Sequence, residues 1–185
     1  MNETEKLNEI ISGCKQGNNE AFSKLIDLYS DRCYGYFYRL TGDANISNDL
    51  LSDLFLRLVE KIGSFSGSSF NNWIFTVASN IFRDYLRQKY RRQKLLDGKI
   101  DQLQHETPDR VLDSELTDKL QKNIAKLDDD SAELLMLRYY GQLSFKELAE
   151  VRKVPIGTVL AKVHRSIKRL KENSSYIAVR YSETA

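Results

Sequence analysis

The last third of the chain contains two consecutive helical patterns separated by a short break, and this pair limits the possible folds more than any other feature. Ser144 and Glu147, three residues apart, form the capping-box pattern of a helix start. Pro155 marks the start of the second helix, because its missing N–H costs nothing there. The apolar residues of the first pattern follow helical spacing: Phe145, Leu148, Ala149 and Val151. The sequence therefore predicts a helix-turn-helix.

The second of these helices has an apolar side and a basic side. The apolar side consists of Val159, Val163, Ile167 and Leu170, and the side chains that project away from it are Lys162, Arg165, Lys168 and Arg169. Between Arg152 and Lys171 there are seven Lys or Arg residues and no Asp or Glu. A helix packed on one side and basic on the other fits the major groove of DNA. An ordinary solvated helix face is the alternative that this pattern alone leaves open.

Composition predicts an all-α protein. The 185 residues suffice for one domain or two small ones, and only two are proline and nine glycine, with few alternating β-type runs. No apolar run reaches the length of a membrane span and the N-terminus is too polar for a secretory signal, so we expect a cytoplasmic protein. Cys14 and Cys33 fit buried thiols better than a disulfide framework or a zinc site. We expect no metal, no cofactor and no enzymatic activity.

The net charge of +2 hides a segregation of charge along the chain. Residues 83–94 carry six basic residues against one acidic, whereas residues 97–133 carry eleven acidic against five basic. Two basic regions separated by an acidic one indicate two contacts with a polyanion. Apolar periodicity predicts helical segments over about 5–40, interrupted near 13–18 and ended by a helix-stop signal at 41–43, and further helices over 46–62 and 71–93. We therefore divide the chain into a domain at 1–95, an acidic linker at 96–113, a second domain at 114–175 and a tail at 176–185.

Six short segments, in this order and spacing, resemble the bacterial RNA polymerase sigma factors of the sigma-70 family, in particular the small extracytoplasmic-function (ECF) group. They are YRLTGD at 38–43, DLLSDLFLRL at 49–58, SFNNWIFTVASN at 69–80, DYLR at 84–87, LMLRYY at 135–140 and IGTV at 156–159. The resemblance implies two small helical domains that bind core RNA polymerase, read the −10 and −35 promoter elements and assist DNA melting. It also implies an anti-sigma partner and no direct insertion into a membrane.

For the N-terminal domain, the resemblance implies docking on the polymerase clamp helices through Asp49, Asp53 and Arg57. These residues are spaced i, i+4, i+8 and line one helix face, although a solvated polar face has the same pattern. The family usually has Gln-Glu where this chain has Ser52-Asp53.

The resemblance also implies that the loop at 63–69, with a mobile aromatic ring at Phe65, and Asn80 hold a base of the −10 element. Trp73 fits a core position better. The basic helix end that follows would then track phosphates, through Arg83, Arg87, Lys89, Arg91 and Arg92.

For the C-terminal domain, the resemblance implies reading of the −35 element by Thr158, Ala161, Lys162, Arg165 and Arg169, with 134–140 holding the polymerase flap. Arg165 is the candidate for a bidentate contact to guanine. The family commonly has a basic residue where this chain has Leu160 and Gly where it has Lys153; a positive φ would cost Lys roughly 1 kcal/mol there.

The acidic linker and the overall function each leave an alternative. In the family the linker runs through the nucleic-acid channel of polymerase, where Asp97, Asp101, Glu106 and Asp109 would imitate phosphates; an ordinary tether is the other interpretation. A stand-alone helix-turn-helix regulator is the alternative function, but it leaves the basic segment at 83–94 without a role.

Overall fold

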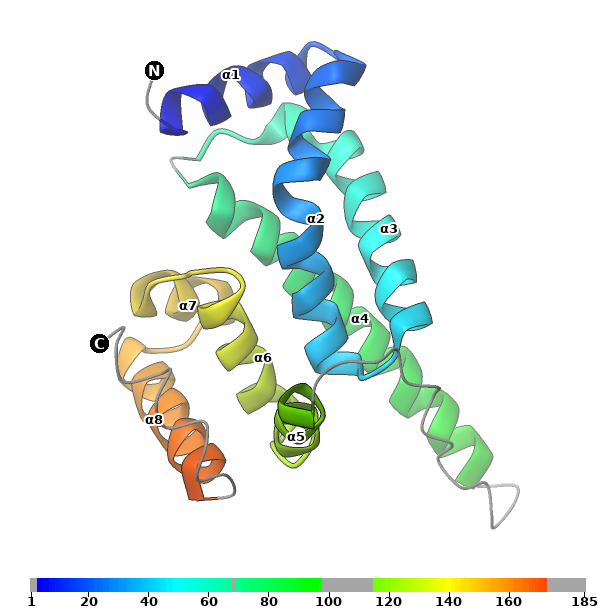
Figure 1. Ribbon diagram of the computed structural model, residues 1–185, viewed down its shortest axis with the longest axis vertical. Coiled ribbons are helices and arrows are strands. Elements are labelled where there is room, and N and C mark those ends of the chain that lie inside the picture. Colours follow the sequence, from blue (N-terminus) through cyan, green and yellow to red (C-terminus); the bar gives the residue numbers. More distant parts are fainter. Residues whose placement is uncertain (1–2, 68, 98–114, 173–185) are drawn as a thin grey trace.

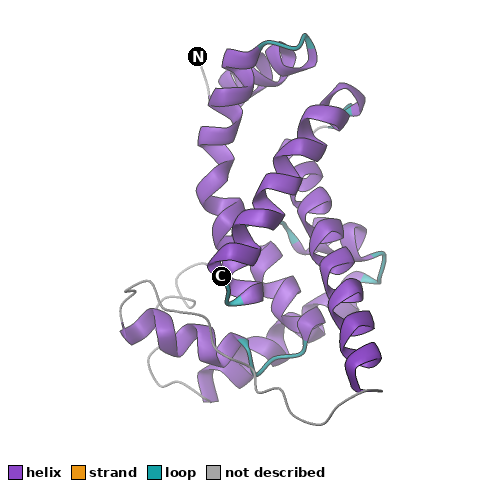
Figure 2. Cartoon of the chain, turned by 90° about the vertical axis from the view of Figure 1, so that its right-hand side faces the viewer, coloured by secondary structure: helices purple, strands orange, loops and turns teal. Residues whose placement is uncertain are grey.

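The computed structural model describes residues 3–67, 69–97 and 115–172, and this part of the chain is built from helices without a strand (Figure 2). The helices are α1 (Glu3–Lys15), α2 (Asn19–Thr41), α3 (Ala44–Lys61), the 3-10 turn η1 (Ile62–Ser64), α4 (Phe70–Asp97), α5 (Glu115–Ile124), α6 (Asp129–Tyr139), α7 (Phe145–Arg152) and α8 (Ile156–Glu172). The all-α prediction is confirmed. The linker acids Asp101, Glu106 and Asp109 and the tail at 176–185 lie outside the described residues.

Helices α1 to α4 form the first unit, which is held by an aromatic core (Figure 1). Tyr36 and Phe37 of α2 and Phe75 and Phe82 of α4 are fully buried. The ring of Tyr36 meets those of Phe37, Phe75 and Phe82 edge-on, with centroids 5.2, 5.7 and 6.5 Å away. Such edge-to-face pairs are a preferred aromatic geometry, so α2 and α4 are fixed in both distance and rotation.

Local capping residues set the helix boundaries of this unit. Asn18 accepts hydrogen bonds from the backbone N–H groups of Glu20 and Ala21 and so begins α2. Gly42 ends α2 at φ 69°, and Asp43 caps α3 by accepting from the N–H of Ile46 at 3.0 Å. The helix stop predicted at residues 41–43 is thereby confirmed.

Helices α5 to α8 form the second unit, in which α7 and α8 are the predicted helix-turn-helix. The capping box is present: Ser144 Oγ accepts from the N–H of Glu147, whose carboxylate accepts from the N–H of Ser144. Lys153 follows α7 at φ 53° and ψ 43°, the left-handed conformation in which a Lys side chain was expected to be costly. The turn therefore has the expected geometry despite its unfavourable residue.

The two units pack against each other, which the sequence did not predict. Helix α6 lies between α2 and α8 (Figure 1), and it buries every residue from Ser131 to Leu137. The buried residues of both units belong to one continuous hydrophobic cluster, and α6 lies where the two units meet within it.

Candidate nucleic-acid interface

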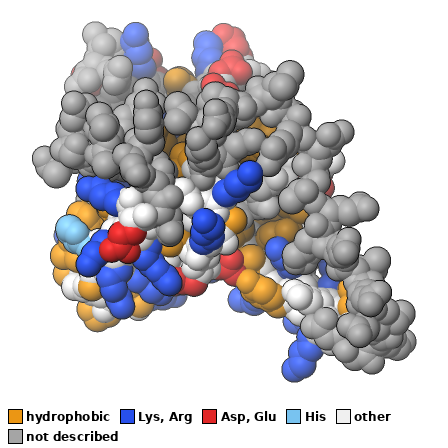
Figure 3. Space-filling view, turned by 60° about the horizontal axis from the view of Figure 1, so that its bottom comes forward, with side chains coloured by type: hydrophobic (Ala, Val, Ile, Leu, Met, Phe, Trp, Pro, Cys, Tyr) orange, Lys and Arg blue, Asp and Glu red, His pale blue; other side chains and the backbone are white. Residues whose placement is uncertain are grey.

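Helix α8 presents a basic surface beside its buried stripe, and part of that surface faces the start of α6. Val159, Val163 and Leu170 are buried, and so is Ser166, whereas Ile167, which was predicted for the apolar side, is half-buried. Of the predicted −35 reader, four residues are exposed: Thr158, Ala161, Arg165 and Arg169. Figure 3 shows Lys and Arg side chains gathered on this part of the molecule, with a few acidic groups among them. A phosphate backbone could lie along such a surface.

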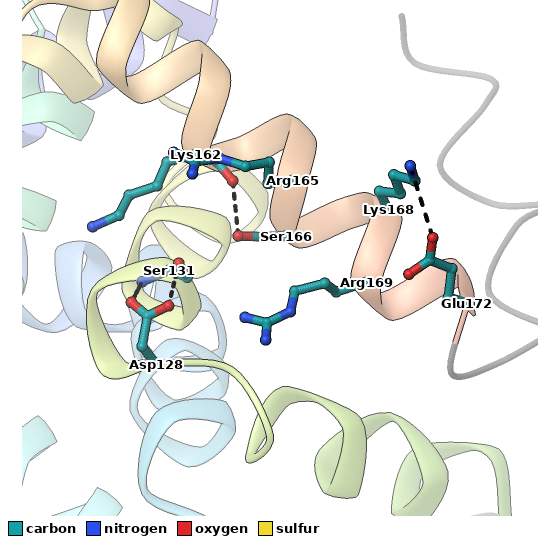
Figure 4. A pocket seen from close by; sticks show the side chains of 8 residues that line it. All are labelled: Asp128, Ser131, Lys162, Arg165, Ser166, Lys168, Arg169 and Glu172. Carbon is teal, nitrogen blue, oxygen red and sulfur yellow. Dashed lines mark hydrogen bonds and ion pairs between the residues drawn. The ribbon is translucent and has the colours of Figure 1, made fainter.

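An open pocket of about 410 Å³ separates this basic surface from the start of α6 (Figure 4). Asp128 caps α6 there, accepting from both the N–H and the hydroxyl of Ser131. The cations that line the pocket are Lys162, Arg165, Lys168 and Arg169. Because Asp128 and Glu172 also line it, the pocket balances positive with negative charge and is less suited to an isolated anion than the outer face of α8.

Lys162, the fifth predicted reader residue, is half-buried and already has a carboxylate partner. Its ammonium pairs with Asp130 of α6, which also pairs with Arg152 of α7. In this arrangement Lys162 is held against its own domain, so contact with DNA requires that it exchange Asp130 for a phosphate.

Most of the α4 residues predicted to contact the −10 element are exposed, but one of them is paired with the second unit. Asn80, Lys89 and Arg91 are exposed, as is Arg87, which pairs with Asp84 one turn earlier. Arg83, by contrast, has an exposed side-chain fraction of 34% and pairs with Glu133 of the second unit at 3.3 Å. Only the exposed group is available to phosphates here.

The prediction that Phe65 is a mobile ring does not match the structure. The ring is 8% exposed and packs against Phe70 and Trp73, whose centroids lie 5.3 and 5.5 Å from its own. Lys15 adds a cation over the ring at 5.6 Å. Apolar contact on several sides outweighs the flexibility that the small residues of the loop suggested, so Phe65 anchors the loop. Trp73, half-buried in the same cluster, has the core position expected of it.

Glu133 is the most unusual polar residue of the molecule, because its side chain is only 2% exposed. It accepts from the hydroxyl of Ser79 and pairs with Arg83 and Arg152, while the hydroxyl of Tyr36 lies 3.5 Å away. Burial raises the pKa of Glu133, although Ser79 and Arg83 oppose that shift. Burial and the neighbouring Arg83 lower the pKa of Arg152 to about 10. No sequence pattern indicated this cluster, since its members come from four different helices.

The predicted docking face on α3 contains an internal ion pair and two exposed apolar residues. Arg57 pairs with Asp53 through two contacts of 3.0 Å, whereas Asp49 is exposed. Leu56 and Val59 are 66% and 52% exposed. Sequence reasoning missed both, although Leu56 could have been found, because it lies opposite the stripe formed by residues 50, 54 and 58 of the same helix.

Comparison with known families identifies both halves of the chain. Residues 25–92 match the family model described as sigma-70 region 2, and residues 124–172 match the one described as sigma-70 region 4. The first match covers α2 to most of α4, and the second covers α6 to α8. None of the helices in the described parts of the chain combines the length and apolar character that a membrane span needs.

Individual relatives agree with these matches. The chain is 29% identical to the ECF RNA polymerase sigma factor SigW of Bacillus subtilis, over 88% of this chain and 93% of that one. It is 28% identical to the ECF sigma factor BldN of Streptomyces coelicolor, over 89% of this chain and 64% of that one. Among solved structures it is similar to the sigma factor RpoE in complex with the anti-sigma factor NepR from Bartonella quintana. That similarity has a TM-score of 0.67 at 25% identity, over 82% of this chain and 95% of the other.

Proposed function

The chain belongs to the ECF group of the sigma-70 family, and on that basis we propose how its surfaces are divided between promoter DNA and core RNA polymerase. As a sigma factor it binds core RNA polymerase and directs initiation at specific promoters. Residues 1–95 form the domain that docks on the clamp and reads the −10 element. Residues 114–175 form the domain that reads the −35 element, with 96–113 as the connection.

The observation that best supports this function is the outer face of α8. A fixed turn at Lys153 and a buried stripe along α8 leave Thr158, Arg165 and Arg169 exposed together. A recognition helix must be packed firmly against its own domain and must also expose a basic face to DNA. Arg165 reads guanine, Thr158 and Ala161 contact base edges, and Arg169 and Lys162 contact phosphates.

For the −10 element, the exposed amide of Asn80 supplies both a donor and an acceptor to a base edge. The buried ring of Phe65 supports this role indirectly, because it fixes one end of the neighbouring loop rather than stacking on a base. Arg87, Lys89 and Arg91 continue along the same helix and contribute salt-sensitive affinity.

The clamp of polymerase binds along the outer side of α3. Asp49 and the Asp53–Arg57 pair give that face its charges, and Leu56 and Val59 give it an apolar centre. Apolar residues surrounded by charge are the usual composition of a protein interface. The flap binds at residues 134–140.

A cytoplasmic location and an inhibitory partner follow from the same assignment. Core RNA polymerase and its template are in the bacterial cytoplasm, and the chain binds rather than transforms its partners. Because the similar RpoE was solved with an anti-sigma factor, we expect an anti-sigma factor for this chain as well. The acidic residues at 97–113 occupy the nucleic-acid channel of polymerase.

The decisive experiment combines the purified chain with a bacterial core enzyme on a library of random promoter-length duplexes. We expect run-off transcripts that depend on the chain, from templates that share two sequence elements, and permanganate-reactive thymines near the downstream one. Core enzyme alone is the control. Tight duplex binding without any binding to core enzyme would instead identify a stand-alone helix-turn-helix regulator.

A further inference from the structure

Helix α1 lies before the residues that match the region 2 family model, yet it contacts the turn η1, which begins the loop assigned to the −10 element. Ile11 and Cys14 of α1 are buried in the hydrophobic core. The approach of α1 to α2 is close, because a Cβ atom built at Gly13 would lie 2.8 Å from the Cβ of Ala21. Helix α1 is therefore packed firmly at a place where it can act on the loop.

The last residue of α1, Lys15, contacts this loop directly. Its ammonium donates a hydrogen bond of 2.5 Å to the carbonyl of Phe65, which is 50 residues away in the chain. The same ammonium lies 5.6 Å from the centroid of the Phe65 ring. A charged donor on a carbonyl and a cation over an aromatic ring are both stabilising contacts. One side chain thus holds the backbone and the ring of one loop residue.

Further contacts restrain the loop on both sides of Phe65. The N–H of Phe65 donates to the carbonyl of Ile62 at 3.1 Å and closes η1. Gly67 lies against the Phe65 ring, and a Cβ atom built there would be 3.3 Å from a ring carbon. Ser66, between these two points, is exposed. The loop at 63–67 therefore presents a hydroxyl group to solvent from a backbone that is held before and after it.

A loop that captures an unstacked base benefits from being ordered in advance. Conformational freedom that is lost on binding lowers affinity, and preorganisation removes that loss. During promoter melting the base must be held before it pairs again with its own strand. A restrained loop at 63–67 would therefore increase the rate of melting, whereas the earlier binding of duplex DNA does not use the loop.

We propose that α1 supports the −10 loop and that Lys15 is a positioning residue for promoter melting. Lys15 holds Phe65 in place before DNA arrives, so that Ser66 and its neighbours receive a base without first being ordered. Lys15 itself contacts neither the base nor a phosphate. The proposal rests on the function assigned above, in which this loop belongs to the −10 site.

The contacts of Lys15 favour this role over a direct contact with DNA. Its ammonium already has a carbonyl and an aromatic ring of the same chain as partners. Lys89 and Arg91 of α4, by contrast, are exposed and were assigned to phosphates above. A phosphate contact would make Lys15 contribute to the salt dependence of DNA binding. A positioning residue changes the rate of melting and leaves that salt dependence as it was.

Fluorescence of the single tryptophan tests the contact in the full chain without DNA. Trp73 packs on Phe65, with ring centroids 5.5 Å apart, so release of the loop exposes the indole. Lys15→Met keeps the length of the side chain and removes its charge. We expect stronger quenching by acrylamide, a neutral quencher, in this variant and quenching close to that of the unsubstituted chain in Lys15→Arg.

Promoter melting with core polymerase gives the second measurement, followed as permanganate reactivity over time. Lys15→Met should melt the promoter about tenfold more slowly, the effect expected for one lost hydrogen bond from a charged group. Lys15→Arg should recover most of this rate. Binding to core polymerase, binding to duplex promoter and its salt dependence should be the same in all three proteins.

Gly67→Ala disturbs the same loop without changing any charge. The added Cβ presses on the Phe65 ring, while the backbone permits alanine because the φ of Gly67 is not positive. We expect both stronger quenching and slower melting, as in Lys15→Met. The matched control is Gly63→Ala, where an added Cβ meets nothing within 4 Å.

Lys6→Met, at an exposed position of the same helix, is the control for the lost charge and should behave as the unsubstituted chain does. Circular dichroism establishes that every variant is folded. Normal melting in Lys15→Met overturns the proposal, and so does a reduced salt dependence with unchanged quenching, because Lys15 would then contact DNA. If the unsubstituted chain directs no initiation by any bacterial core enzyme, the assigned function fails instead.

Discussion

Helices α6 and α8 are neighbours in one domain, yet they are exposed in opposite ways. Helix α8 buries one stripe and leaves a basic face in water, whereas α6 buries all seven residues from Ser131 to Leu137, including a glutamate. A helix with one apolar stripe needs one packing partner, whereas a helix that is buried on all sides needs two. The exposed face of α8 can therefore be predicted from the sequence of α8 alone. The burial of α6 depends on the first unit, which is distant in the chain.

The largest expected effect comes from removing apolar contact inside α6. Leu137 is fully buried, so Leu137→Ala should lower the free energy of unfolding by about 2–5 kcal/mol. Urea denaturation followed by circular dichroism measures the change. Leu56→Ala, at an α3 position that is 66% exposed, is the control and should stay within about 0.5 kcal/mol. Equal, small changes in both variants would show that α6 is not packed on both sides.

On α8 the corresponding substitution should affect recognition and leave stability unchanged. Arg165→Ala removes an exposed guanidinium, and we expect a loss of about 1–3 kcal/mol in discrimination at one base pair of the upstream element. Sequencing of promoters selected with polymerase measures it. Lys168→Ala on the same helix should weaken binding uniformly across sequences. Unchanged base preference in Arg165→Ala would remove this residue from the reader.

The turn between α7 and α8 offers a smaller effect whose sign is informative. Lys153 has φ 53°, so Lys153→Gly should raise the free energy of unfolding by up to about 1 kcal/mol. Lys146→Gly, inside α7, should lower it by about the same amount because glycine is a poor helix former. Thermal unfolding of the two variants compares them. A loss of stability in both would mean that the positive φ carries no strain.

The smallest effect concerns the buried carboxylate of α6 and its dependence on pH. Because the pKa of Glu133 is raised on folding, the native state binds its proton more tightly than the unfolded chain does. Stability therefore falls as pH rises from about 4.5 through the raised pKa, and Glu133→Gln lacks this term. The difference in unfolding free energy between the two proteins, measured from pH 4 to 8, should shift in favour of the variant as pH rises. A difference that does not vary with pH would contradict the raised pKa.

Sequence reasoning succeeded wherever the cause of a structure is local. The capping box at Ser144 and the helix stop at Gly42 were each predicted from a few adjacent residues. The outward placement of Arg165 followed from helical periodicity in the same way.

It failed where the cause is distant. Phe65 was predicted to be mobile because its neighbours are small and polar, but it is buried against the rings of Phe70 and Trp73 on α4. In the sequence Glu133 was only one of the eleven acidic residues at 97–133. In the structure it is buried beside Tyr36, which is 97 residues away, and Ser79, which is 54 residues away. No periodic pattern encodes a contact between separately patterned units, so this part of the site required coordinates.

The missing side chain at Gly35 also bears on engineering. A designer who wishes to retarget a regulator of this kind would graft a foreign promoter-reading module onto the first ninety-five residues. The graft must bring a planar ring at the position of Tyr140, because that ring packs so closely on Gly35 of α2 that an added Cβ would lie 2.3 Å from it. Chimaeras with a different side chain there would lose this contact between the units, whatever DNA they were built to recognise.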